Sequence, residues 1–224
     1  MQSTYYKGRQ AAAYNQSWKQ FSERTHAVAC SMLDFERLQQ PVGVQGRPRR
    51  ILDVACGTGL LLHNLSIRFP HAELYGVDAS QEMLAQAYLR LYDHAHVHFT
   101  QASLTGGKRA GLPYEPESFD LITCTNAFHY FSDPVATLHG LSELLLPQGQ
   151  LLIEDYARRT FPFPWPLFEW LIKRVDPQHR HAFILEEAQE LCQQAGLEVR
   201  TATRFPIDLL WKGWALLAWS GSVY

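Results

Sequence analysis

From residue 50 onward, short apolar runs alternate with segments in which leucine and alanine recur every three or four positions. The apolar runs predict strands at 50–54, 73–77, 96–99, 118–124, 150–155, 197–201 and 211–219. The segments between most of them have the spacing of amphipathic helices. Strands that alternate with helices are typical of a parallel sheet covered on both faces. The pattern therefore predicts an α/β fold with a doubly wound, mostly parallel sheet.

Three local signals fix helix ends. Ser80 is a suitable N-cap, and Asp133 followed by Pro134 is a strong start signal. Gly196 follows a helical pattern that runs from residue 185 and is a natural C-terminal stop.

Ligands of such sheets bind at the carboxyl ends of the strands, so the residues that follow each strand are the candidate ligand-binding residues. The first strand runs into Gly57-Thr58-Gly59, and Asp78 ends the second strand, 19 residues beyond Gly59. Glycines at such a turn let a ligand approach the backbone. A carboxylate at the end of the second strand accepts hydrogen bonds from a ribose diol. The two features together predict a nucleoside-containing ligand.

Two departures argue against a dinucleotide as this ligand. Leu62 occupies the place of the third glycine in the GxGxxG pattern. Asp53 points a carboxylate toward the loop, which repels a pyrophosphate and favours an ammonium or sulfonium group. The loop therefore favours a cationic nucleoside over a nicotinamide cofactor.

The composition narrows the class of protein. The 224 residues are 46% apolar and 19% charged, which is typical of a globular protein. The net charge of −2 argues against nucleic acid as a partner. No secretory leader or membrane-spanning run is apparent, and the four cysteines form no CxxC pair. We therefore expect a cytoplasmic protein with reduced thiols and no stable membrane insertion.

Seven motifs at the strand ends carry a family resemblance: residues 51–59 (ILDVACGTG), 76–84 (GVDASQEML), 112–114, 118–122, 126–131, 133–134 and 146–151. They resemble class I S-adenosylmethionine-dependent methyltransferases, and within them the small-molecule branch that includes ubiquinone and menaquinone C-methyltransferases. The resemblance covers residues 50 to about 155. It implies a Rossmann-like, seven-stranded sheet with its last strand antiparallel and helices on both faces.

The resemblance also implies a cofactor, S-adenosylmethionine, with S-adenosylhomocysteine as product. It places Asp53 near the ammonium, Asp78 on the ribose hydroxyls and Met83 against the adenine. Ser103 stands where the family often has an aspartate that accepts from the adenine amino group. The implied contact residues are Asp53, Ala55, Cys56, Gly57, Thr58, Gly59, Asp78, Ala79, Met83, Ala102, Ser103, Leu104, Asn126, Ala127 and Tyr14. Cys56 is expected to act as a small packing residue, and no metal is expected.

Methyl transfer from a sulfonium depends mainly on placement and desolvation, so a general base is needed only when the acceptor must lose a proton. His129 is the candidate base, because imidazole titrates near neutral pH. The alternative is that His129 packs under the following helix. The N/DPPY signature of nucleobase methyltransferases is missing, which favours a small-molecule acceptor over DNA or RNA.

The chain is expected to form a single domain, 1–224, in four parts. These are an N-terminal helical lid segment (1–48), a cofactor-binding core (49–156), an aromatic and proline-rich insertion (157–182), and a C-terminal helix with strands (183–224). The N-terminal segment either closes over the cofactor or packs on the sheet as an ordinary amphipathic helix. The insertion either lines an apolar acceptor pocket or caps the core. Residues 179–181 are expected to form a solvated loop, with contact to a polar acceptor group as the alternative.

Basic residues concentrate in the first 50 positions, which hold 8 basic and 3 acidic side chains. Arg47, Arg49 and Arg50 precede the first strand and are expected to be solubility charges. The basic residues expected to reach the site are Lys7, Arg9, Lys19 and Arg24. They favour an acceptor with an anionic group, and the aromatic insertion, if it lines the pocket, favours an acceptor that is also aromatic or apolar.

The resulting hypothesis is a methyltransferase, monomeric or homodimeric, that acts on a small organic acceptor by in-line displacement. The alternatives are a non-catalytic module that binds S-adenosylmethionine or S-adenosylhomocysteine, and a nicotinamide-dependent oxidoreductase.

Overall fold

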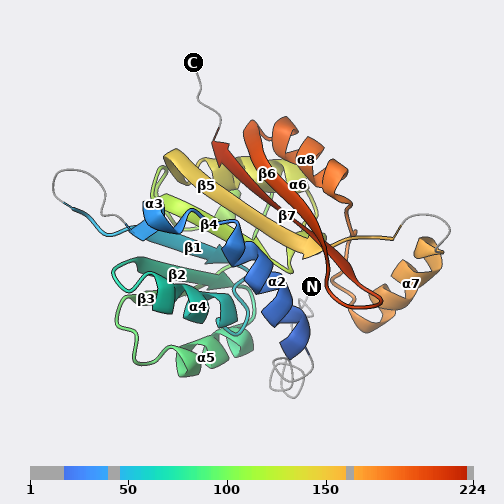
Figure 1. Cartoon of the computed structure of the whole chain (residues 1–224), viewed down its shortest axis with the longest axis horizontal. Coiled ribbons are helices and arrows are strands. Elements are labelled where there is room, and N and C mark those ends of the chain that lie inside the picture. The colour runs from blue at the N-terminus through green and yellow to red at the C-terminus, as the bar shows by residue number, and fades with distance from the viewer. Residues whose placement is uncertain (1–17, 40–45, 160–163, 221–224) are drawn as a thin grey trace.

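A seven-stranded sheet forms the centre of the computed structural model, which describes residues 18–39, 46–159 and 164–220 (Figure 1). The strand order is β3-β2-β1-β4-β5-β7-β6. The strands are β1 (Arg50–Val54), β2 (Glu73–Asp78), β3 (Val97–Gln101), β4 (Phe119–Thr125), β5 (Leu145–Tyr156), β6 (Leu197–Pro206) and β7 (Lys212–Ser220). Strands β1 to β5 pair in parallel, and β7 inserts antiparallel between β5 and β6. The predicted fold, with its antiparallel last strand, is confirmed.

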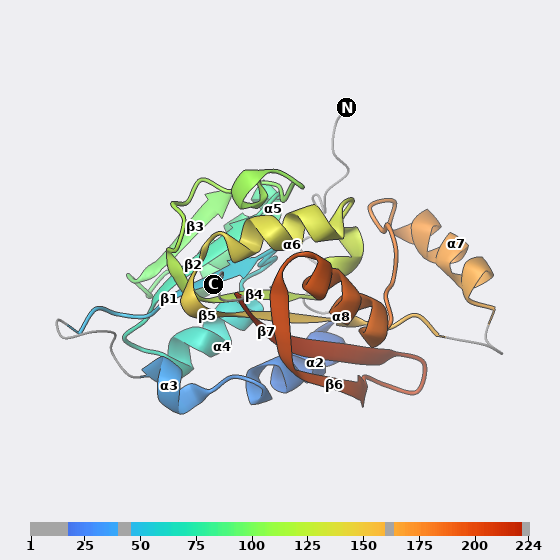
Figure 2. The same ribbon diagram turned by 90° about the horizontal axis from the view of Figure 1, so that it is seen from above.

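Helices cover both faces of the sheet (Figure 2). They are α2 (Lys19–Ser31), α3 (Phe35–Gln39), α4 (Leu60–Arg68), α5 (Gln81–Arg90), α6 (Pro134–Ser142), α7 (Trp165–Val175) and α8 (Leu185–Gln194), with single turns η1 (Lys108–Gly111) and η2 (Phe128–Tyr130). Leucines of α6 and α8 pack with Leu52, Phe119 and Trp214 on one face. Leucines of α3 and α4 and Ala29 of α2 pack with Ile51 and Leu121 on the other. Strands buried on both faces explain their almost uninterrupted apolar sequence.

The predicted helix ends are confirmed. The Met83 N–H donates to Ser80 Oγ at 3.2 Å, and the Ala136 N–H donates to Asp133 Oδ1 at 3.0 Å. Gly196 follows α8 with a φ of +79°, a conformation that favours glycine.

Strand β5 begins earlier than predicted. It starts at Leu145, which pairs with Phe119, and the register then shifts so that Leu121 pairs with Gln150. The turn residues 147–149 therefore form an irregularity inside the strand. A turn signal read from sequence does not reveal that pairing has already begun before it.

The arginines before β1 are not solubility charges, and that prediction was wrong. Asp120, buried at the start of β4, accepts hydrogen bonds from Arg47 Nη1 at 2.9 Å, from Arg49 Nη1 at 2.8 Å and from the Arg50 backbone N–H at 2.9 Å. Burial alone raises the pKa of Asp120, but these donors bring it below its ordinary value. The arginines thus hold an ionised carboxylate inside the protein. The cluster lies at the amino ends of β1 and β4, opposite the carboxyl ends of the strands.

Candidate functional site

A cavity of about 460 Å³ opens at the carboxyl ends of β1, β2, β3 and β4. Its lining includes most of the residues predicted to contact a cofactor: Asp53, Ala55, Cys56, Gly57, Thr58, Asp78, Ala79, Met83, Ala102, Ser103, Leu104, Asn126 and Ala127. Gly59 and His129 are predicted site residues that do not line it, and Tyr14 lies outside the described residues. The volume falls in the range of about 300–1,000 Å³ that is usual for small-molecule sites.

The two glycines of the β1–α4 turn have different roles. Gly57 lines the cavity with a φ of +53°, and a Cβ built on it meets no atom within 4 Å. Gly59 has a φ of +73°, and a Cβ there lies 3.0 Å from the Cβ of Ala87. Gly57 therefore exposes backbone to the cavity, whereas Gly59 permits close packing of α4 against α5.

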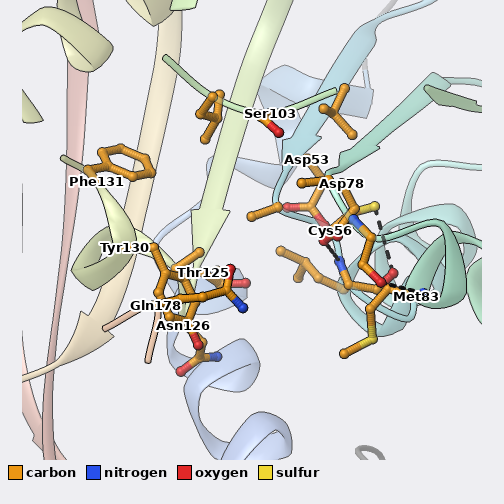
Figure 3. Close-up of a pocket in the computed structure, with 18 of the residues that line it drawn as sticks. Asp53, Cys56, Asp78, Met83, Ser103, Thr125, Asn126, Tyr130, Phe131 and Gln178 are labelled. Atoms are coloured by element: carbon orange, nitrogen blue, oxygen red, sulfur yellow. Dashed lines mark hydrogen bonds between the residues drawn. The ribbon is translucent and has the colours of Figure 1, made fainter. Parts of the chain in front are cut away.

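Asp78 binds the same turn from the end of β2. Its Oδ2 accepts the Gly57 N–H at 2.9 Å, and its Oδ1 accepts the Ser80 N–H at 2.8 Å (Figure 3). Burial raises the pKa of Asp78, and these N–H groups offset part of that effect. The Ala79 N–H also lowers the pKa, and because a carboxylate has about four lone-pair sites, the group can still accept a hydrogen bond from a ligand.

Asp53, the second carboxylate of the cavity, is 2% exposed. Its Oδ1 accepts from Thr123 Oγ1 at 2.7 Å. Burial raises the pKa of Asp53 to about 7, and the charge of Asp78 adds to the rise. A cation bound beside Asp53 would offset this cost of ionisation, so the geometry favours a positively charged ligand.

Cys56 lies beside these carboxylates and lines the cavity. Burial raises the pKa of its thiol well above the ordinary value, with the charges of Asp53 and Asp78 adding to the rise. The thiol therefore stays protonated at neutral pH, which fits the predicted packing role.

Across the open space, Thr125, Asn126, Tyr130 and Gln178 form the other half of the cavity (Figure 3). Asn126 follows β4 with a φ of +53°, uncommon for a residue other than glycine. Its Nδ2 donates to Thr25 Oγ1 at 2.9 Å, while its Oδ1 is buried and accepts no hydrogen bond from the described residues. A ligand donor in the cavity would satisfy that oxygen.

Helix α2 adds His26 to the cavity, a residue that the sequence reading missed. His26 is 7% exposed, and its Nε2 lies 3.4 Å from Thr125 Oγ1. Burial lowers its pKa to about 4, so the ring is neutral at physiological pH. The two partners are 99 residues apart in sequence, and only the amphipathic pattern of the N-terminal segment hinted that it packs on the sheet.

Residues 179–181 were expected to form a solvated loop, and for His179 that expectation was wrong. His179 is 2% exposed, its Nδ1 lies 2.8 Å from the Tyr156 hydroxyl, and its Nε2 lies 3.0 Å from Glu169 Oε1. The next residue, Arg180, lines the cavity, as do Pro177 and Gln178. Residues 177–180 thus form a wall of the cavity, and the hydrogen-bonding contacts of His179 hold this wall in place.

His129 packs behind this wall. It is 5% exposed, and its Nδ1 lies 2.8 Å from Asp155 Oδ2. The ring is therefore buried, as the packing alternative expected, but it lies against Asp155 and Tyr156 at the end of β5 rather than under the following helix, α6.

Two aromatic residues of the insertion help to form a small core. Trp165 and Phe168 of α7 pack with Tyr156, Ile207 and Trp211, beside the tip of the β6–β7 hairpin (Figure 1), and neither lines the cavity. Phe161 and Phe163 lie outside the described residues.

The basic residues expected to reach the site do not line the cavity where the structure describes them. Arg24 Nη1 donates to the Ile207 carbonyl at 2.5 Å instead. Lys7, Arg9 and the side chain of Lys19 lie outside the described residues.

In the described ranges, no group of three or more histidine, cysteine, aspartate or glutamate side chains is placed to hold a metal ion. No described helix is long and apolar enough to cross a membrane.

Comparisons with known proteins identify the family of the chain. A ubiquinone biosynthesis O-methyltransferase of Aromatoleum aromaticum is 25% identical over 190 residues, which are 81% of this chain and 76% of that protein. A demethylmenaquinone methyltransferase of Thermotoga maritima is 35% identical over 131 residues, 58% of this chain and 54% of that protein.

A similar solved structure is phosphoethanolamine N-methyltransferase 2 of Haemonchus contortus in complex with S-adenosyl-L-methionine. It shares 15% identity with a TM-score of 0.73, over 98% of this chain and 58% of that one, which shows a common fold. The family model for a methyltransferase domain matches residues 21–202. The chain therefore belongs to the methyltransferase domain family.

Proposed function

We propose that this protein uses S-adenosylmethionine as methyl donor and transfers the methyl group to a small organic acceptor. The observation that carries the proposal is the placement of Asp53 and Asp78 around the Gly57 turn in one cavity. One carboxylate suits the ammonium of this donor and the other suits the diol of its ribose, and the exposed backbone turn lies between them.

The residues of the cofactor half fit the donor in detail. Asp78 would accept a hydrogen bond from the ribose hydroxyls, and Asp53 would pair with the ammonium. Ala79, Met83 and Leu104 offer apolar surface for the adenine. When bound, S-adenosylmethionine supplies a methyl carbon already activated by a positively charged sulfur. The protein's own contribution is to bind, orient and exclude water.

The second half of the cavity favours an enzyme over a binding module. The neutral ring of His26 and the exposed Arg180 line the cavity and are not among the residues assigned to the donor. A module that only binds the cofactor has no use for a second polar surface. The family membership, together with Leu62 in place of a third glycine, also favours methyl transfer over nicotinamide-dependent oxidation.

The relatives point to the kind of acceptor. Their names describe O-methylation in ubiquinone biosynthesis and methylation of demethylmenaquinone. We extend this to a small acceptor of quinone-precursor type, attacked at oxygen or carbon, with the enzyme acting in the cytoplasm. The four free cysteines, all buried in the described structure, fit a reducing compartment.

A transfer assay tests the proposal. The wild type is incubated with methyl-labelled S-adenosylmethionine and a panel of hydroxybenzoates, catechols and naphthoquinols. We expect label in at least one acceptor, and strong loss of transfer with Asp78→Ala but not with the matched surface control Asp93→Ala. Binding of S-adenosylhomocysteine without transfer to any acceptor would support the non-catalytic module instead.

A further inference from the structure

The cavity wall formed by residues 177–180 is held by side-chain hydrogen bonds before it and within it. The Tyr130 hydroxyl donates to Asp176 Oδ2 at 2.6 Å, immediately before the wall. Within it, the ring of His179 bridges Tyr156 and Glu169. One contact before the wall and two within it therefore restrict the orientation of its backbone.

Backbone hydrogen bonds complete the anchoring. The N–H groups of Arg180 and His181 both donate to the His129 carbonyl, at 3.0 and 3.2 Å. His129 is held in turn by Asp155, which accepts its backbone N–H at 2.8 Å. The backbone of Arg180 is thus held in place, and the residue lines the cavity.

The guanidinium of Arg180 has no carboxylate partner among the described residues, unlike the guanidinium groups of two other arginines. Arg158 pairs with Glu187, and Arg49 pairs with Asp120. Within residues 18–39, 46–159 and 164–220, no carboxylate lies within ion-pair distance of Arg180. An exposed guanidinium on an anchored backbone, at a cavity and without an acidic partner, is available to bind an anion.

The surroundings of Arg180 suit an anion. The two carboxylates that line the cavity, Asp53 and Asp78, come from the ends of β1 and β2. Glu154, whose carbonyl accepts the Asn126 N–H, is fully buried with a pKa raised well above its ordinary value by that burial. Burial therefore disfavours a negative charge on Glu154 in this half of the cavity.

The position of Arg180 separates it from the donor. It is anchored to the segment that follows β4, whereas the donor's ribose and ammonium are assigned to the ends of β2 and β1. We propose that Arg180 binds an oxyanion of the methyl acceptor, so that the acceptor is a small organic acid or phosphate ester. This assignment rests on the proposed methyl transfer and narrows its substrate class.

The test measures anion binding directly, without the natural acceptor. Protein saturated with S-adenosylhomocysteine is titrated with matched pairs of probes: benzoate against methyl benzoate, glutarate against dimethyl glutarate, and phenyl phosphate against phenol. The variants are Arg180→Gln, Arg180→Lys and, as a control that removes the same charge outside the cavity, Arg174→Gln. The carboxylate and phosphate arms separate the two kinds of acceptor.

We expect the wild type to bind at least one anion about tenfold or more tightly than its uncharged counterpart, the scale of one charge-assisted hydrogen bond. Arg180→Gln should abolish that preference and Arg180→Lys retain part of it, with S-adenosylhomocysteine affinity unchanged in both. No anion preference in the wild type, or the same preference in Arg180→Gln, overturns the assignment. Weaker S-adenosylhomocysteine binding by Arg180→Gln also overturns it, because the arginine would then serve the donor. Failure of the wild type to bind S-adenosylhomocysteine defeats the proposed function itself.

Discussion

The ring Nδ1 of His129 and the backbone N–H of the same residue both lie 2.8 Å from one oxygen of Asp155, Oδ2. The other oxygen, Oδ1, accepts the Tyr156 N–H at 2.7 Å. This buried carboxylate therefore organises the end of β4, the end of β5 and, through the His129 carbonyl, the wall that carries Arg180.

Replacing Asp155 should therefore affect both stability and acceptor binding. Asp155→Ala leaves buried donors of His129 and Tyr156 without an acceptor, and we expect a loss of about 2–4 kcal/mol in the free energy of unfolding. Urea denaturation measures it. Asp155→Asn, which keeps one acceptor oxygen, should lose less. Equal stability of wild type and Asp155→Ala would show that the carboxylate does not organise this region.

Asp53 should reduce the stability of the ligand-free protein near neutral pH. Its pKa of about 7 exceeds the ordinary value of 3.8, so the folded protein holds a proton that the unfolded chain releases between these values. Its contribution to stability is therefore complete below about pH 4 and is lost as the pH rises toward 7. Asp53→Asn removes that loss and keeps an oxygen for Thr123.

We accordingly expect the Tm advantage of ligand-free Asp53→Asn over wild type to grow between pH 4.5 and pH 7.5, and the corresponding gain in the free energy of unfolding to reach at most about 4 kcal/mol. The same variant should bind S-adenosylmethionine more weakly at neutral pH. Asp93→Asn is the surface control. A Tm difference that is constant with pH would contradict the buried, raised-pKa carboxylate.

The two glycines of the β1–α4 turn should respond differently to alanine. Gly59→Ala places a Cβ against Ala87 at 3.0 Å in a left-handed backbone, so it should lower the free energy of unfolding by about 2 kcal/mol or more. Gly57→Ala meets no atom but strains the turn that binds Asp78, so S-adenosylhomocysteine affinity should fall further than stability does. Denaturation and calorimetry on both variants check this. The reverse order of effects would refute the division of roles.

The Asp120 cluster should be structural alone. Asp120→Ala leaves Arg47, Arg49 and the Arg50 N–H without their acceptor, and we expect a loss of about 2–4 kcal/mol in the free energy of unfolding. Affinity for S-adenosylhomocysteine should be unchanged, because the cluster lies at the amino ends of the strands and the cavity lies at their carboxyl ends. A variant that loses ligand affinity without losing stability would place the cluster in the site instead.

The sequence was informative wherever a local signal determined the structure. Alternating periodicity predicted the sheet, and Ser80 and Asp133 predicted helix starts because a cap acts within three residues. The turn at Gly57 and the carboxylate of Asp78 were recognisable because a fixed spacing joins them across one βαβ unit.

The sequence was not informative wherever a side chain meets a distant one. His26 reaches Thr125 across 99 residues, and Arg49 reaches Asp120 across 71. Nothing local distinguishes the buried His179 from the exposed Arg180 beside it. These contacts depend on how helices and loops pack on the sheet, which periodicity does not specify.

Calorimetric titration of S-adenosylhomocysteine into the wild type and Asp78→Ala tests the central claim most directly. The account predicts micromolar-range binding by the wild type. It predicts a loss of about tenfold to a hundredfold in Asp78→Ala, the scale of one or two hydrogen bonds to a charged group. Asp93→Ala should bind as the wild type does. An absence of binding heat in the wild type, or equal affinity in Asp78→Ala, would contradict the account.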